Sequence, residues 1–340
     1  MPVRMPRPRF LVSRLPRAAV LAALLGAASP WTVPAADAQA FTLFAGPLSG
    51  AGTHSAGWAF DYREGLGKYA AAGFTWYNEG HLPSHHRDGQ SVQLWGRLPL
   101  GRRRFVLSAG VGPYRYFDTE AAGQGRGYSN THGWGVLMSV RAAYYGSRRW
   151  LLQVQANRVH TFSGPDTTSM MFGIGYQLAA PDRPGPCDYA TGRLDRVTNQ
   201  EVTGMIGETI LNSRSSPSSL GASVEYRRGI AKHLDWTATY LYEGSKRQTR
   251  RNGVATELWL TRAFLDDRIA LAAGAGLYVA VDQRHMRGSN TGDGRLSCIV
   301  SISASYRLGR SWLTRLTWKR VVTRYDRDTD VIQAGLGYRF

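Results

Sequence analysis

Cysteines, long apolar segments and acidic residues are all scarce in this 340-residue sequence. Its two cysteines, Cys187 and Cys298, are too few for a disulfide scaffold. After the first 40 residues, no segment approaches the roughly 18 consecutive apolar residues of a membrane-spanning helix. Acids are also few, with 24 Asp and Glu against 42 Lys and Arg, for a formal net charge of +18. These absences exclude a disulfide-rich secreted domain and a helical membrane protein.

The first 40 residues are typical of a secretory signal peptide. Five arginines precede a short apolar run, AAVLAALLGAA, and Ala38 and Ala40 provide a small-residue cleavage site. Cleavage after Ala40 removes the five arginines and Asp37, so the formal charge falls from +18 to +14. Because an exported basic chain seldom meets nucleic acid, we expect no nucleic-acid partner. Anionic lipid head groups or anionic polysaccharides are the expected partners.

The remainder of the chain contains one unit written twice. Residues 57–95 align without a gap to residues 221–259 at a constant offset of 164. Identical pairs in this alignment include Tyr62 and Tyr226, Arg63 and Arg227, Glu79 and Glu243, Arg87 and Arg251, and Trp95 and Trp259. The same offset pairs Tyr114 with Tyr278, and an offset shorter by two pairs Arg158 with Arg320. We therefore expect repeat 1 over 41–178, a periplasmic linker over 179–201 and repeat 2 over 202–340.

Each repeat divides into about eight extended runs. In repeat 1 these are expected at 41–48, 55–64, 69–79, 90–100, 104–118, 133–146, 149–162 and 167–178. Short connections alternate with long polar ones, as periplasmic turns alternate with outer loops in transmembrane β-barrels. Polar and apolar residues also alternate within the runs, which have lengths of about 9–11 residues and aromatic ends. These patterns predict an all-β protein, a transmembrane antiparallel β-barrel of about sixteen strands.

The last eight residues, QAGLGYRF, carry a resemblance to a known family. They resemble the terminal signal of Gram-negative outer-membrane β-barrel proteins, with Gln333, Gly335, Tyr338 and Phe340 in the signal positions. The resemblance implies location in the cell outer membrane and recognition by the barrel-assembly machinery. It assigns no specific functional family. Repeat 1 ends with an echo of the signal, MFGIGYQL.

The sequence leaves open whether the two repeats close separately. The linker, the echoed signal and the bulky inward Trp95 and Trp259 favour two eight-stranded barrels. The rarity of tandem barrels in one chain favours a single sixteen-stranded barrel, because the pairing that closes one unit can equally join it to its neighbour. We slightly favour the single barrel.

Charged residues shared by the repeats are candidates for function. The lumen candidates are Arg63, Arg227, Glu79, Glu243, Arg315 and Lys319. They either satisfy one another as internal ion pairs or form a field that selects solutes. Arg158 and Arg320 fall on the lipid side near the outer rim, where an arginine can bind lipopolysaccharide phosphates.

Three functions fit these patterns. The first is a porin-like pore or conduit for anionic solutes or polysaccharide. The second is a non-catalytic, plugged envelope or surface barrel. The third is a lipid A-modifying hydrolase, but His160 and Ser163 are three apart and fall on opposite faces of a strand. His81, His85 and His86 lack paired acids in the sequence and are interpreted as part of a solvated outer loop. We expect no catalytic residues, no metal and no cofactor.

Overall fold

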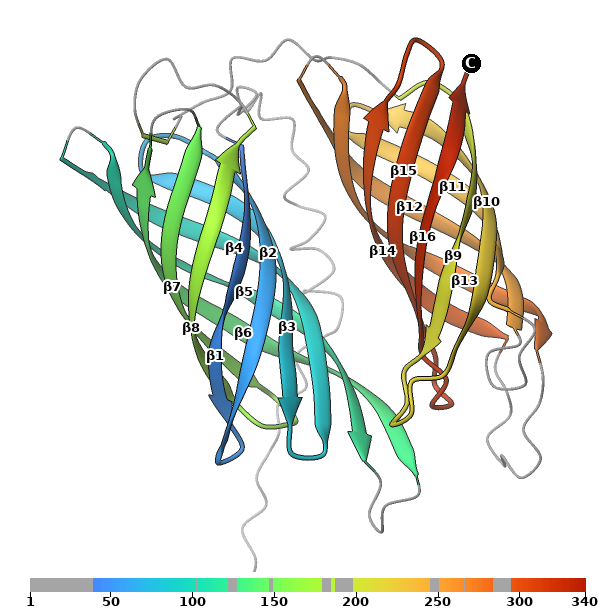
Figure 1. Ribbon diagram of the computed structural model, residues 1–340, viewed down its shortest axis with the longest axis horizontal. Coiled ribbons are helices and arrows are strands. Elements are labelled where there is room, and N and C mark those ends of the chain that lie inside the picture. The colour runs from blue at the N-terminus through green and yellow to red at the C-terminus, as the bar shows by residue number, and fades with distance from the viewer. Residues whose placement is uncertain are drawn as a thin grey trace, which may run out of the picture. The chain divides into compact units, whose positions relative to one another are not determined.

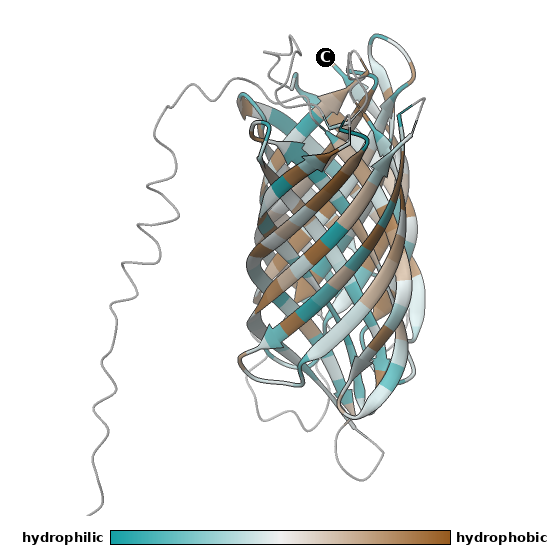
Figure 2. Ribbon diagram, turned by 90° about the vertical axis from the view of Figure 1, so that its left-hand side faces the viewer, coloured by the Kyte–Doolittle hydropathy of each residue, from teal (hydrophilic) through white to brown (hydrophobic). Residues whose placement is uncertain are grey.

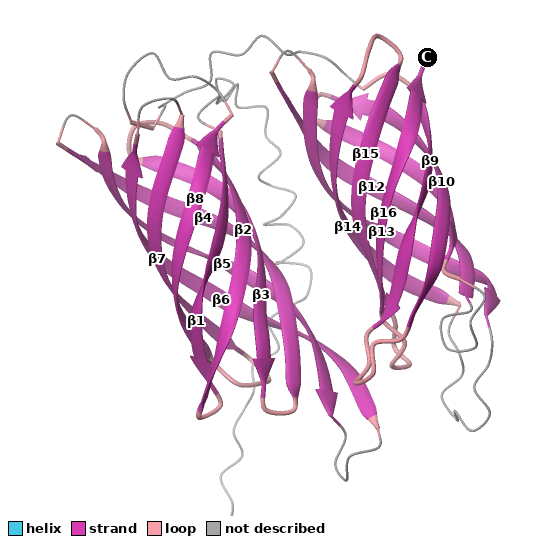
Figure 3. Ribbon diagram, viewed as in Figure 1, coloured by secondary structure: helices cyan, strands magenta, loops and turns pink. Residues whose placement is uncertain are grey.

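The computed structural model describes residues 39–101, 103–121, 127–146, 149–178, 185–186, 198–244, 251–265, 267–283 and 295–340. Nearly all of these residues lie in strands (Figure 3). No helix in the described part of the chain has the length and hydropathy to cross a membrane. Residues 1–38 of the predicted leader and most of the predicted linker, including Cys187, lie outside the described residues.

Repeat 1 contains eight antiparallel strands (Figure 1). They are β1 Ala40–Gly50, β2 Thr53–Gly65, β3 Ala70–Leu82, β4 His85–Leu100, β5 Phe105–Ala121, β6 Tyr128–Tyr145, β7 Trp150–Thr161 and β8 Thr167–Gln177. Each strand pairs with the next, and β8 pairs with β1, so the sheet is a closed barrel. We call the end at which β1 begins the linker end and the opposite end the loop end.

Repeat 2 has the same organisation. Its strands are β9 Glu201–Leu211, β10 Ser218–Ala231, β11 Leu234–Tyr242, β12 Arg251–Phe264, β13 Ile269–Gln283, β14 Leu296–Arg307, β15 Trp312–Val322 and β16 Thr329–Arg339. Here β16 pairs with β9, from Thr329 opposite Leu211 to Arg339 opposite Glu201. This sheet is therefore also closed on itself.

The separate closures correct the preference for one sixteen-stranded barrel. The backbone N–H and C=O groups at the edge of β8 could bond equally to β1 or to β9. In the structure, β8 pairs with β1 along nine residue pairs. Glycines permit the close strand approach at both seams. A Cβ on Gly46 would lie 2.1 Å from the carbonyl oxygen of Met170, and one on Gly335 would lie 2.0 Å from that of Gly204. These distances exclude a side chain, so the narrow closure depends on the glycines.

Several strands extend further toward the loop end than the sequence pattern predicts. The expected outer loop around His81, His85 and His86 instead forms the ends of β3 and β4, joined by a turn at Pro83 and Ser84. Ser84 has a φ of 63°, in the left-handed region. The sequence pattern did not predict this hairpin because His85, His86, Arg87 and Asp88 are consecutive polar residues without apolar alternation.

The outer walls of both barrels are apolar. Hydropathy alternates along the strands in Figure 2, and the outward positions carry large exposed hydrophobic side chains. Representative examples are Leu43, Val92, Leu94, Val140, Phe172, Ile206, Leu258 and Leu316. The outward Cys298 is a free, exposed thiol. Inward positions are polar and buried, which reverses the arrangement of a soluble protein and fits a barrel surrounded by lipid.

Candidate functional site: the charged barrel interiors

A carboxylate clamped by an arginine lies near the loop end of barrel 1. Arg87 on β4 donates to Glu79 on β3 through both Nε and Nη2, at 2.7 and 2.6 Å. The Tyr114 hydroxyl donates to the same carboxylate at 2.8 Å, and the Thr167 hydroxyl also donates to it. Both members of the ion pair are fully buried. The paired charges and their hydrogen bonds compensate for the loss of water.

Barrel 2 repeats this arrangement. Arg251 donates to Glu243 at 2.7 and 2.8 Å, and the Tyr278 hydroxyl donates to Glu243 at 2.6 Å. A glycine allows the tyrosine to lie across the interior, because a Cβ on Gly253 would be 2.4 Å from Cζ of Tyr278. The sequence prediction included Glu79 and Glu243 but not Arg87 and Arg251. Their identity in both repeats was the signal that could have identified them.

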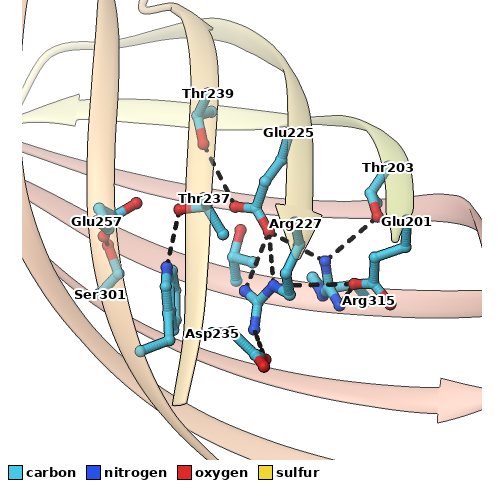
Figure 4. A network of polar contacts seen from close by, with 12 residues as sticks. Glu201, Thr203, Glu225, Arg227, Asp235, Thr237, Thr239, Glu257, Ser301 and Arg315 are labelled. Atoms are coloured by element: carbon cyan, nitrogen blue, oxygen red, sulfur yellow. Dashed lines mark hydrogen bonds and ion pairs between the residues drawn. The ribbon is translucent and has the colours of Figure 1, made fainter. Parts of the chain in front are cut away.

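A second network fills the linker half of barrel 2 (Figure 4). Glu225 on β10 accepts from Arg227 Nη2 at 3.0 Å, from Arg315 Nη1 at 3.0 Å and from Lys319 Nζ at 3.1 Å. Lys319 also donates to Glu257 on β12 at 2.8 Å. The side chains of Glu225 and Lys319 have no exposed surface. The predicted lumen charges Arg227, Arg315 and Lys319 therefore lie in one shared cluster.

Further acids complete this cluster. Arg315 binds Glu201 on β9, and Arg227 lies 3.5 Å from Asp235 on β11. The guanidinium carbon of Arg227 lies 4.4 Å from the centre of the Trp259 ring. Strands β9, β10, β11, β12 and β15 thus contribute charges to one cluster inside the barrel.

Barrel 1 fills its linker half with fewer acids. Arg141 on β6 donates to Asp61 at 2.7 Å, and Arg63 lies 4.0 Å from the same carboxylate. The Trp95 ring contacts both guanidinium groups, at 3.8 Å for Arg63 and 4.6 Å for Arg141. Buried N–H groups without a hydrogen-bond partner remain on Arg63, Trp95 and Arg141. Arg63 does not meet Glu79, which is bound by Arg87 near the opposite end.

The two predicted lipopolysaccharide contacts differ in exposure, because the Arg320 side chain is buried, with only 6% of its surface exposed. The Arg158 side chain is 58% exposed and donates to Asp166 at 3.2 Å. Arg320 donates to Asp330 on the neighbouring β16 through Nε and Nη2, both at 2.7 Å. Each guanidinium therefore already has an acidic partner.

The predicted assembly signal occupies the end of β16. Tyr338 and Phe340 point outward with stacked rings whose centres are 6.4 Å apart. Gln333 points inward and accepts from the Ser223 hydroxyl at 2.6 Å. Gly335 lies at the seam with β9. The two aromatic side chains therefore present a contiguous apolar surface at the linker end.

The residues of the hydrolase alternative have separate partners. His160 Nδ1 lies 3.0 Å from Asp166, whereas the Ser163 hydroxyl lies 2.9 Å from the Tyr116 hydroxyl. A nucleophilic serine requires a base within hydrogen-bond reach. In the described contacts, His160 and Ser163 bind different residues and do not bind each other.

Closed sheets, apolar outer walls and polar interiors define a transmembrane β-barrel protein. The sequence matches no protein-family model and no curated protein. Among solved structures, the chain is similar to outer-membrane β-barrel proteins. Ail of Yersinia pestis, in complex with the heparin analogue sucrose octasulfate, has 10% identity over 41% of this chain and 96% of its own, with a TM-score of 0.32.

Two further structures are similar in fold. Neisserial surface protein A has 13% identity over 41% of this chain and 94% of its own, with a TM-score of 0.30. The translocator domain of the autotransporter NalP from Neisseria meningitidis has 12% identity over 95% of both chains, with a TM-score of 0.20.

Proposed function

We propose that this protein is a non-catalytic outer-membrane envelope protein whose two barrels are closed to solutes by their own side chains. The observation that carries the proposal is the fully buried Lys319 between Glu225 and Glu257. An eight-stranded barrel is just wide enough for its inward side chains to fill. The charges predicted to line a lumen are instead held by other interior residues, such as Arg87, Arg251 and Glu225.

Opening such an interior would separate ion pairs. Removing one partner of a buried pair leaves an uncompensated charge, at a cost of about 3–5 kcal/mol. The clamps at Glu79 and Glu243 and the network around Glu225 would all have to rearrange. We therefore expect the closed state to be the stable one in both barrels.

Conductance in planar lipid bilayers tests this proposal. The full mature protein, with its folding verified by the shift in gel mobility on heating, is expected to give no steady channels when an established porin does so under the same conditions. Steady conductance from folded protein would contradict the closed-barrel proposal.

A conduit for anionic solutes or polysaccharide is the second candidate. The unpartnered N–H groups of Arg63, Trp95 and Arg141 favour it for barrel 1, because they are buried donors that an anion can satisfy. If the protein conducts, Arg63→Gln should shift its reversal potential toward cation selectivity. The matched variant Arg227→Gln in barrel 2 should shift it less, because Glu225 and Asp235 neutralise Arg227.

The proposed location implies the partners. The signal at Gln333, Gly335, Tyr338 and Phe340 would be recognised by the barrel-assembly machinery, and the outer walls would contact lipid. Arg158, whose side chain is exposed, would contact lipopolysaccharide at the outer rim, whereas the buried Arg320 would contribute less to this contact.

A further inference from the structure

A histidine and two carboxylates meet at the loop end of barrel 1. His85 on β4 lies directly opposite Glu120 on β5, and Asp118 lies two residues before Glu120 on the same face. One donor atom from each of the three residues lies within 4.8 Å of the other two. His85 Nδ1 is 2.8 Å from Asp118 Oδ2 and 3.9 Å from Glu120 Oε1.

These spacings are close to those of a metal site. Ligand atoms in a tetrahedral zinc site lie about 3.3 Å apart, as follows from metal–ligand distances of about 2.0–2.1 Å. Small side-chain rotations would therefore bring the three atoms into one coordination sphere. The exposed fractions are 23% for the His85 side chain and 36% for Glu120. Water can reach this side and complete the coordination.

The burial of Asp118 is an independent indication of a cation. Its side chain is 2% exposed, and its Oδ1 atom is buried without a hydrogen-bond partner. A buried carboxylate oxygen without a donor is costly, and a bound cation would satisfy it. Asp118 and Glu120 together supply two negative charges, which match a divalent ion.

The neighbouring cationic side chain, Arg87, binds other groups. Arg87 lies opposite Asp118 in the register, but its Nε and Nη2 atoms donate to Glu79 and its Nη1 atom donates to the carbonyl oxygen of Pro165. The Glu120 carboxylate is oriented by the Thr131 hydroxyl, which donates to Oε1 at 2.8 Å. A hydrogen bond of this kind holds a metal ligand in place.

We propose that His85, Asp118 and Glu120 form a binding site for a divalent transition-metal cation, with Zn²⁺ as the ion that best fits this donor set. One imidazole and two carboxylates leave a coordination position for water. The ion would join β4 to β5 beyond the membrane and stiffen the loop end of barrel 1. This assignment does not depend on whether the barrels conduct.

Repeat 2 provides a natural comparison. At the offset of 164, its sequence keeps Asp282 in the place of Asp118 but has Thr249 and Arg284 in the places of His85 and Glu120. The proposed site therefore belongs to repeat 1 alone, and the protein should bind one ion per chain.

Isothermal titration of the folded mature protein with ZnCl₂ in detergent tests the proposal. We expect one site per chain with a dissociation constant in the micromolar range or below. His85→Ala and Asp118→Asn should each weaken binding by at least about tenfold. Asp282→Asn, the matched change in repeat 2, should leave binding unchanged. The heat-dependent gel shift confirms that each variant is folded.

Other histidines need their own controls. The rings of His81 and His86 stack with centres 4.4 Å apart, and His160 lies beside Asp166. His81→Ala and His160→Ala should both retain wild-type affinity. Loss of zinc binding in either variant, with retention in His85→Ala, would overturn the assignment.

The choice of metal is tested with Ca²⁺. A transition-metal site should prefer Zn²⁺, because the imidazole of His85 is a poor ligand for Ca²⁺. Equal binding of the two ions, unaffected by His85→Ala, would contradict the proposed site. Absence of Zn²⁺ binding below millimolar concentration would also overturn it.

Discussion

Trp259 donates its indole N–H to the Thr237 hydroxyl over 3.0 Å, whereas its counterpart Trp95 in barrel 1 faces Gly73 and has no acceptor. Gly73 and Thr237 occupy equivalent positions at the offset of 164. The residue at this position, Gly73 or Thr237, therefore decides whether the interior tryptophan has a hydrogen-bond acceptor. Barrel 1 has an unused donor where barrel 2 has a hydrogen bond.

Gly73→Ser should stabilise barrel 1. A Cβ at Gly73 would lie 3.3 Å from Trp95 Nε1 and 3.1 Å from the Tyr62 carbonyl oxygen, so small adjustments admit the side chain. Its hydroxyl can accept from the indole, which is worth about 0.5–1.5 kcal/mol. Gly73→Ala is the matched control for removing a strand glycine without adding an acceptor. Urea unfolding should show the serine variant to be more stable than the alanine variant, and equal stability would contradict the prediction.

Breaking the clamp in barrel 2 should be strongly destabilising. Arg251→Met leaves Glu243 buried without its bidentate partner, which should cost about 3–5 kcal/mol of unfolding free energy. The double variant Glu243→Gln with Arg251→Met should recover part of this loss. Arg158→Ala, which removes an exposed ion pair, should cost at most about 1 kcal/mol. A loss in Arg251→Met no larger than in this control would show that the clamp contributes little.

Deletion of Phe340 should reduce outer-membrane insertion sharply. Phe340 is 59% exposed and stacks with Tyr338 on the apolar wall, so its loss removes the end of the proposed assembly signal. Membrane fractionation and the gel shift on heating measure the folded fraction. Leu178 holds the matching position in repeat 1, and Leu178→Ala should leave assembly unchanged because that position is internal. Unchanged insertion without Phe340 would refute the signal.

Lipopolysaccharide should stabilise the wild-type protein more than Arg158→Ala. The Arg158 guanidinium is exposed on the outer wall, and loss of a charge-assisted hydrogen bond to phosphate would cost about 1–3 kcal/mol. Arg320→Ala should show a smaller lipopolysaccharide-dependent change, because the Arg320 side chain is only 6% exposed. Thermal unfolding with and without lipopolysaccharide separates the two contributions. If Arg158→Ala lowers the thermal stability equally with and without lipopolysaccharide, Arg158 does not contact lipopolysaccharide.

The sequence predicted which face of each strand its residues occupy. Side chains alternate with a period of two, so parity alone placed Arg63, Arg315 and Lys319 inward and Arg158 outward. It did not predict partners, because the strands are tilted and residues at the same depth come from distant parts of the sequence. Lys319 accordingly donates to Glu225 and Glu257, which lie 94 and 62 residues before it in the sequence.

The candidate metal site escaped the sequence for a similar reason. His85 stands in a histidine-rich segment without a nearby acid pair, and Asp118 and Glu120 follow more than thirty residues later. Only the pairing of β4 with β5 brings them together. The same extension of these strands replaced the expected loop with a hairpin.

The sequence by itself determined the repeat, the strand periodicity and the apolar outer faces, because these depend on residue spacing along the chain. The tertiary structure alone decided that the chain closes twice. The backbone N–H and C=O groups at a strand edge are alike in every strand and do not specify a partner. On these groups alone, β8 could have paired with β9. Pairing of β8 with β1 and of β16 with β9 satisfies those groups within each repeat and brings the charged side chains of each repeat together inside its own barrel.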